Sequence, residues 1–135
     1  MEFKYSDAGR KLSKRPKQIN DCVVRALALA VEIPYDVAYD MAASHGRQSG
    51  RGMVHAHIRA LFDSVPRIAG RHVFQAVKGQ PRMNARRFAE AYPSGRWIVQ
   101  FAGHYVAVVD GVFHDTVAAG CRPTRCVYSA WEVVP

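Results

Sequence analysis

Apolar residues recur at helical spacing through the first two-thirds of the chain. Between residues 22 and 31 they lie about 3.6 positions apart, and the alanines and leucines of this segment are good helix formers. A second helix should begin at Pro34, which suits a first helical turn, and end at Gly46. A third should run from about residue 53 to residue 62. Asn84 is placed to cap a short fourth helix.

The last third of the chain has a different, β-prone pattern. Runs rich in β-branched and aromatic residues predict four strands, over residues 96–102, 104–109, 112–115 and 126–134. Asp110-Gly111 is a two-residue hairpin signal between the second and third of these strands. Residues 2–6 and 72–77 are weaker strand candidates. Because helices precede strands, we expect an α+β fold in which N-terminal helices pack on a C-terminal antiparallel β-sheet.

The chain length and the character of the N-terminus bound the organisation. A chain of 135 residues supports one hydrophobic core, so we expect a single domain over residues 1–135. No run of about 18 apolar residues predicts a membrane span. Residues 1–7 lack the pattern of a signal peptide, so a cytoplasmic protein is the expectation. Residues 1–17 form a basic N-terminal segment that could be mobile. For its stretch from Lys11 to Lys17 the sequence leaves open a mobile flap, a cleavable leader or an ordered rim of a cleft.

The net charge of +8 indicates an anionic partner. The candidate partners are an acidic protein, a bacterial cell envelope and a nucleic acid. A solvated basic surface without any partner is the alternative. No aromatic-interleaved basic patch of the kind that stacks bases is present, so nucleic-acid binding rests on charge alone and is not expected. A steep dependence of binding on salt concentration would reveal it.

Cys22 stands out among the three cysteines because it begins the first predicted helix. The N-terminus of a helix favours thiolate over thiol, and Asn20 or Asp21 can cap this end. The other two, Cys121 and Cys126, either pair with each other or remain buried thiols, and a reducing compartment favours the second possibility. A cysteine nucleophile also needs a nearby base, and that base needs an orienting group.

The predicted hairpin supplies both groups. His104 follows Gly103 at the start of one strand, and Asp115 ends the return strand. Pairing around the Asp110-Gly111 turn places Asp115 within about two residues of His104 across the ladder, in reach of its ring. Because residues alternate between the faces of a strand, His114 should point away from that site.

These stretches together resemble the papain-like superfamily of cysteine peptidases in a small form. They are most similar to bacteriocin-processing-type and phage-encoded peptidase-like domains. The stretches are Gln18 with Asn20-Asp21-Cys22, Gly103 to Val108, and Phe113 to Thr116. The resemblance implies that Cys22 is the nucleophile, that His104 is the general base and acid, and that Asp115 orients His104. It implies that Gln18 donates its amide to the oxyanion, although Gln18 lies closer to Cys22 than in papain, which makes Asn20 a rival donor.

The functions that follow differ in class. A thiol hydrolase acting on an amide or isopeptide bond is the first, most simply a peptidase that acts on a peptide or protein, including an acidic one. It requires no metal and no cofactor. A lysin-type peptidoglycan amidase or endopeptidase is the second, since the run from Gly103 to Val109 also resembles such domains. A papain-like fold used only for binding, as an inhibitor of an acidic host protein, is the third, and it predicts that Cys22 is dispensable. The oligomeric state is open.

Overall fold

Helices lie in the first two-thirds of the chain in the computed structural model, which describes residues 1–135. The α-helices are α1 (Cys22–Val31), α2 (Tyr35–Ser44), α3 (His55–Asp63) and α4 (Ala85–Ala91). They confirm the helices predicted from apolar spacing, and the Asn84 side chain caps α4 by accepting the backbone N–H of Arg87 at 2.8 Å. Short 3-10 turns cover Arg10–Leu12 and Ala118–Cys121. None of these helices has the length and apolar character needed to cross a membrane.

One six-stranded sheet runs through the molecule in the order β1-β5-β4-β3-β6-β2. The strands are β1 (Glu2–Tyr5), β2 (Ile68–Val73), β3 (Arg96–Phe101), β4 (His104–Val109), β5 (Val112–Asp115) and β6 (Ser129–Val133). The α+β class is therefore confirmed, but the expectation of a purely antiparallel sheet is wrong, because β1 pairs with β5 in parallel. Such a pair needs a long connection, and all the helices and three strands lie between β1 and β5 along the chain. The candidate strand at 72–77 is shifted, since β2 ends at residue 73.

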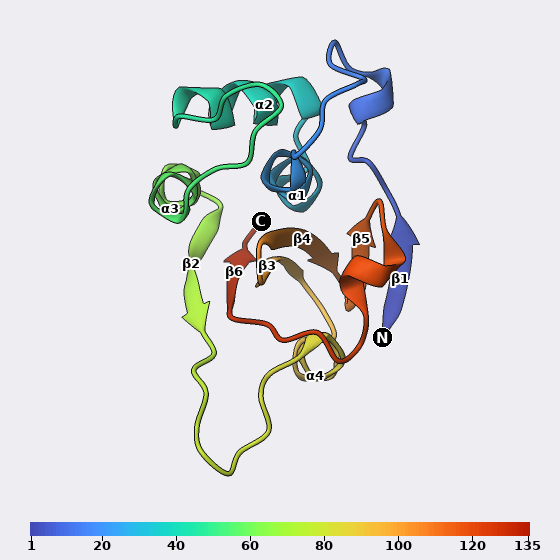
Figure 1. The fold of residues 1–135 in the computed structure, drawn as a ribbon, viewed down its shortest axis with the longest axis vertical. Coiled ribbons are helices and arrows are strands. Elements are labelled where there is room, and N and C mark those ends of the chain that lie inside the picture. The colour runs from blue at the N-terminus through green and yellow to red at the C-terminus, as the bar shows by residue number, and fades with distance from the viewer.

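The helices cover both faces of the sheet (Figure 1). One buried cluster joins α1, α2 and α3 to one face, where Leu27 and Phe62 pack near Tyr105 and Trp131. A second cluster lies on the opposite face, around Phe88 of α4. Helix α1 packs mainly on β4, the strand that begins with His104, and its small alanines allow this close approach.

The β4–β5 hairpin has the predicted register. Val109 pairs with Val112 and Ala107 with His114, on either side of the Asp110-Gly111 turn. The first residue of β4, His104, and the last residue of β5, Asp115, are therefore at the same end of the hairpin. Asp110 takes a φ of 49° in the turn, a conformation that Asp tolerates better than most residues.

Candidate active site

Cys22 is the first residue of α1, and its side chain is partly buried. Asp21 occupies the N-cap position, but its side chain makes no capping hydrogen bond, so the expectation that Asp21 or Asn20 caps the helix through its side chain is wrong. The Asp21 carboxylate is instead buried and held by cationic and hydroxyl donors. The backbone N–H groups of the first turn, including that of Cys22, have no acceptor within the helix and lie at its positive end.

His104 and Asp115 form the second part of the site. Nε2 of His104 lies 2.5 Å from Oδ2 of Asp115, and Asp115 is almost completely buried. Burial would raise the pKa of the Asp115 carboxyl, but the hydrogen bonds from His104 and Arg25 lower it well below its usual range. Burial would likewise lower the pKa of His104, but the hydrogen bond to Asp115 and the nearby Cys22 raise it to about 9. His104 therefore carries a positive charge at neutral pH.

The imidazolium acts on the neighbouring thiol. Burial would raise the pKa of Cys22, but the neighbouring imidazolium of His104 lowers it below its ordinary value, helped by the backbone N–H of Tyr105. Because Nε2 of His104 is hydrogen-bonded to Asp115, Nδ1 is the ring nitrogen that remains available to interact with Cys22. A thiolate beside an imidazolium is the arrangement needed for nucleophilic attack on a carbonyl.

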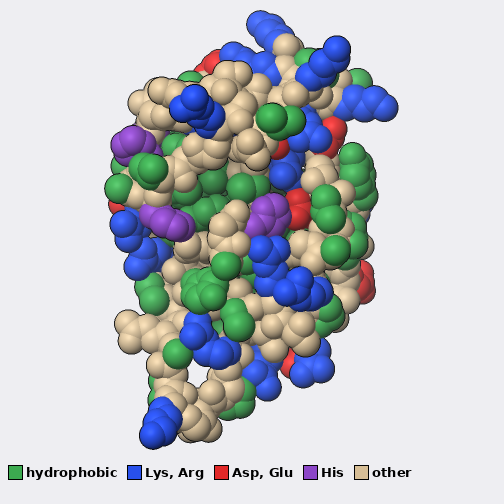
Figure 2. Space-filling view, in the orientation of Figure 1, with side chains coloured by type: hydrophobic (Ala, Val, Ile, Leu, Met, Phe, Trp, Pro, Cys, Tyr) green, Lys and Arg blue, Asp and Glu red, His purple; other side chains and the backbone are tan.

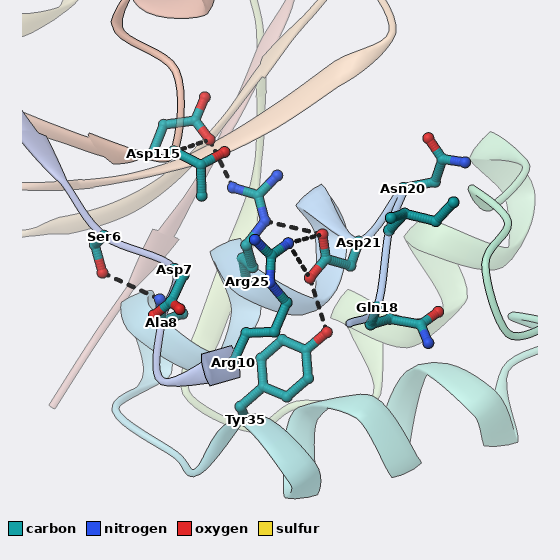
Figure 3. A network of polar contacts seen from close by, with 12 residues as sticks. Ser6, Asp7, Ala8, Arg10, Gln18, Asn20, Asp21, Arg25, Tyr35 and Asp115 are labelled. Atoms are coloured by element: carbon teal, nitrogen blue, oxygen red, sulfur yellow. Dashed lines mark hydrogen bonds and ion pairs between the residues drawn. The ribbon is translucent and has the colours of Figure 1, made fainter. Parts of the chain in front are cut away.

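Arg25 links the two halves of the site, a contact that the sequence analysis did not anticipate. Its Nη1 donates to Oδ1 of Asp115 at 2.6 Å, and its Nε donates to Oδ1 of Asp21 at 3.0 Å. Figure 3 shows the Arg25 guanidinium lying between the two carboxylates. A signal was present in the sequence, because Arg25 is the one charged residue in the otherwise apolar α1.

Asp21 is the second site residue that the sequence analysis left without a role beyond the helix start. Besides Arg25 it accepts hydrogen bonds from Arg10 at 3.0 Å and from the Tyr35 hydroxyl at 2.7 Å (Figure 3). Burial alone would raise its pKa, but the Tyr35 hydroxyl and the two arginines lower it. Arg10 thereby ties the basic segment 1–17 to the site, and Arg15 ties it to α2 through Asp36 at 2.7 Å.

Two small cavities open at the Cys22 side chain. One, of about 140 Å³, is also lined by Arg47, His55 and Tyr105, and the other, of about 290 Å³, by Arg25 and His104. Asn20 lines both, and its φ of 53° is a left-handed conformation that Asn accepts more readily than most residues. One amide hydrogen of Asn20 donates to the carbonyl of Gly50 at 2.9 Å, which leaves the second available.

The structure does not bring Gln18 to the thiol. Gln18 lines neither cavity, and its Oε1 accepts from Arg47 at 2.9 Å and from the backbone N–H of Gly50. Its Nε2 donates to Ser49 at 3.3 Å. Figure 3 shows the Gln18 side chain directed away from the Asp21 network. Gln18 therefore braces the loop around Gly50, and Asn20 is the better placed amide donor.

The remaining cysteines are free thiols rather than a disulfide. Cys121 is buried, with Sγ 3.5 Å from Oδ2 of Asp115. Burial and the negative charge of Asp115 raise the pKa of Cys121 to about 12, whereas the pKa of Cys22 is lowered. His114 points away from Asp115, as expected, since it pairs with Ala107 on the face covered by α1. No group of three or more His, Cys, Asp or Glu side chains is arranged to hold a metal ion.

No family model, no curated protein and no solved structure matches this chain. The resemblance to papain-like hydrolases therefore rests on the sequence stretches alone, and the structure adds only the arrangement of their residues in space. That arrangement brings together a helix-start thiol, a hairpin imidazole and a buried carboxylate, which are distant in the sequence.

Proposed function

We propose that this protein is a cysteine hydrolase that cleaves an amide or isopeptide bond, with a peptide or protein as its substrate. The observation that supports the proposal best is the convergence of Cys22, His104 and Asp115. The three come from α1, β4 and β5, and their mutual effects on pKa have the sign that a nucleophile, a base and an orienting group require.

The first half-reaction begins at the thiolate of Cys22. It attacks the carbonyl carbon of the scissile bond, and the carbonyl oxygen becomes an oxyanion. The backbone N–H of Cys22 and the amide of Asn20 are the donors best placed for this oxyanion, and the dipole of α1 adds to their effect. His104 then gives its Nδ1 proton to the leaving nitrogen. The C–N bond breaks, the amine departs, and the substrate acyl group remains on Cys22 as a thioester.

The second half-reaction restores the enzyme. His104, now neutral, takes a proton from water, and the resulting hydroxide attacks the thioester carbonyl. The C–S bond breaks, the carboxylic acid product leaves, and the thiolate–imidazolium pair forms again. Asp115 stays ionised throughout. It holds the imidazole by the Nε2 hydrogen bond, and Arg25 holds Asp115 in turn.

A papain-like arrangement of the fold belongs to the same proposal. Its support is the placement of the α1 N-terminus at the open end of the β4–β5 hairpin, with the nucleophile on the helix and the base on the sheet. With one six-stranded sheet and four short α-helices, the protein would be a small form of that fold.

The proposal is tested by digestion of a peptide library prepared from a whole proteome, with cleavage sites read by mass spectrometry. Wild-type protein should generate new termini that are absent with Cys22→Ala and with His104→Ala. Equal cleavage by Cys22→Ala would contradict the proposal. Cys22-dependent loss of turbidity of purified peptidoglycan, without cleavage of the library, would favour a cell-wall substrate. Failure of both assays would favour a protein that only binds.

A further inference from the structure

A larger groove lies beside the Cys22 site, between α3 and the edge of the sheet. It has a volume of about 600 Å³ and is formed by α3, the β2 strand with the residues that follow it, and β6. Tyr128 and Phe74 give it aromatic walls, and Trp131 lies at its base, 2% exposed. The groove is wide enough to take several side chains of an extended chain.

The charges of this groove are all of one sign. Arg59 of α3, Arg71 of β2 and Arg82 of the loop before α4 line it, and no Asp or Glu does. None of the three forms an ion pair, although six other arginines of the chain do. Arg82 lies over the Tyr128 ring at 5.3 Å, and its Nε is buried without a hydrogen-bond partner. Figure 2 shows Lys and Arg side chains spread over this face of the molecule, with few acidic ones.

The groove is continuous with the thiol site. His55 and Tyr105 line both the groove and the smaller cavity at Cys22, and their side chains are joined by a contact of 3.1 Å between Nδ1 and the hydroxyl. Burial raises the pKa of Tyr105 to about 12, and the negative charge of Cys22 raises it further. The positive charges of Arg59 and Arg71 act in the opposite direction and lower it. A chain that lies in the groove therefore passes the nucleophile.

We propose that the groove selects substrates that carry acidic side chains close to the scissile bond, with Arg59 and Arg71 as the residues that determine this specificity. The inference rests on the proposed hydrolase function and adds the substrate class to it. A guanidinium is weakly hydrated and pairs with a carboxylate through two parallel hydrogen bonds, so the unpaired arginines suit Glu and Asp side chains. The aromatic walls suit the rest of an extended peptide. A basic or neutral peptide would gain nothing from these arginines.

The direct test is an NMR titration of the ¹⁵N-labelled native protein with end-blocked octapeptides of alternating Ala and Glu, Ala and Gln, or Ala and Lys. The Ala–Glu peptide should shift the signals of Arg71, Gln100 and Tyr128. Each exposed ion pair should lower the dissociation constant by a factor of about 1.4 to 5. Two pairs should therefore make the Ala–Glu peptide bind about tenfold more tightly than the Ala–Gln peptide. Equal binding of the three peptides, or shifts elsewhere, would overturn the inference.

Charge reversal gives a second, independent reading. The double variant Arg59→Glu/Arg71→Glu should bind the Ala–Lys peptide in preference to the Ala–Glu peptide, because both side chains are exposed and can change sign without burying a charge. Arg86→Glu is the matched control, since Arg86 is exposed on α4 and lines no part of the groove. An unchanged preference in the double variant would contradict the role of the two arginines. If the double variant does not fold, the singles Arg59→Gln and Arg71→Gln should each weaken Ala–Glu binding by a factor of about 1.4 to 5.

Two further outcomes separate this inference from its alternatives. An oligothymidine of eight nucleotides that competes with the Ala–Glu peptide at equal or lower concentration would assign the groove to nucleic acid and overturn the inference. Iodoacetamide reactivity of Cys22, measured without peptide, reports the proposed hydrolase function alone. An activated Cys22 with no preference among the peptides refutes the specificity and leaves the function. An inert Cys22 with a clear preference refutes the function and leaves an acidic-peptide binding groove.

Discussion

Replacement of Arg25 should destabilise the whole fold and loosen the Asp115 carboxylate at the same time. The Arg25 side chain is 12% exposed, and its partners Asp21 and Asp115 are 2% and 1% exposed. Arg25→Met keeps the length and the apolar stem of the side chain but leaves two buried carboxylates without a shared cation. Removal of one partner of a buried ion pair typically costs about 3–5 kcal/mol.

The contacts that remain set the expected loss at the lower end of that range. Asp21 keeps Arg10 and Tyr35, and Asp115 keeps His104 and the backbone N–H of Thr116. We therefore expect a loss of about 3 kcal/mol in the free energy of unfolding. With a urea dependence of about 1.5–2 kcal/mol per molar, the midpoint should fall by about 1.5–2 M. Arg25→Lys should lose about half as much, since an ammonium keeps the charge but cannot reach both carboxylates in a fork.

The measurement is urea unfolding at pH 7, followed by circular dichroism. Arg86→Met is the control, because Arg86 forms only an exposed pair with Glu90 at 3.9 Å and should change stability by no more than about 0.5 kcal/mol. The pKa values of the Asp21 and Asp115 carboxyls are lowered in the fold, so their stabilisation is present above their ordinary pKa and is lost as the pH falls through the lowered values. The deficit of Arg25→Met should therefore shrink in acid. If the urea midpoint of Arg25→Met falls no further than that of Arg86→Met, the reasoning is refuted.

Three further results are expected. Asp115→Asn should return the pKa of His104 from about 9 toward its ordinary 6.5, read by NMR titration of the imidazole, and an unchanged pKa would contradict the pairing. Asn20→Ala should lower kcat on a cleaved peptide by about 10²–10³-fold without slowing alkylation of Cys22, whereas Gln18→Ala should cost less than about tenfold; the reverse order would make Gln18 the oxyanion donor. Leu27→Ala, at a position with 0% exposure, should cost about 2–5 kcal/mol in thermal unfolding, and a smaller loss would contradict its place in the core.

Local signals in the sequence were sufficient for the elements that carry the site. The apolar spacing after residue 21 predicts α1 with the bounds that the structure shows, and the Asp110-Gly111 turn predicts the β4–β5 register. Both depend on interactions between residues close in the chain, which propensity and turn chemistry describe well. The pairing of Cys22 with His104 was inferred from their positions at a helix start and a strand start and from the resemblance, and in the structure both residues line the same small cavity.

Long-range pairing was the part that the sequence could not supply. The parallel partner of β1 is a strand near the other end of the chain, and no local pattern specifies it. Arg25 reaches Asp115 across 90 positions, so its role could be suspected only from its isolation in an apolar helix. The choice between Gln18 and Asn20 depends on the left-handed backbone at Asn20 and on the hydrogen bonds of the Gly50 loop, neither of which follows from spacing.

The central claim is the thiolate–imidazolium pair of Cys22 and His104, and site-resolved alkylation tests it most directly. Native protein is treated with limiting iodoacetamide from about pH 5 to 9, the range that separates an activated thiol from an ordinary one, and the labelled cysteines are mapped by mass spectrometry. Because its pKa is lowered, Cys22 should react rapidly at pH values where a free thiol is still almost fully protonated. Cys121, whose pKa is raised to about 12, should remain unlabelled as an internal reference. In His104→Ala the reactivity of Cys22 at those pH values should disappear. A Cys22 that reacts no faster than Cys126, or that is unaffected by His104→Ala, would contradict the account.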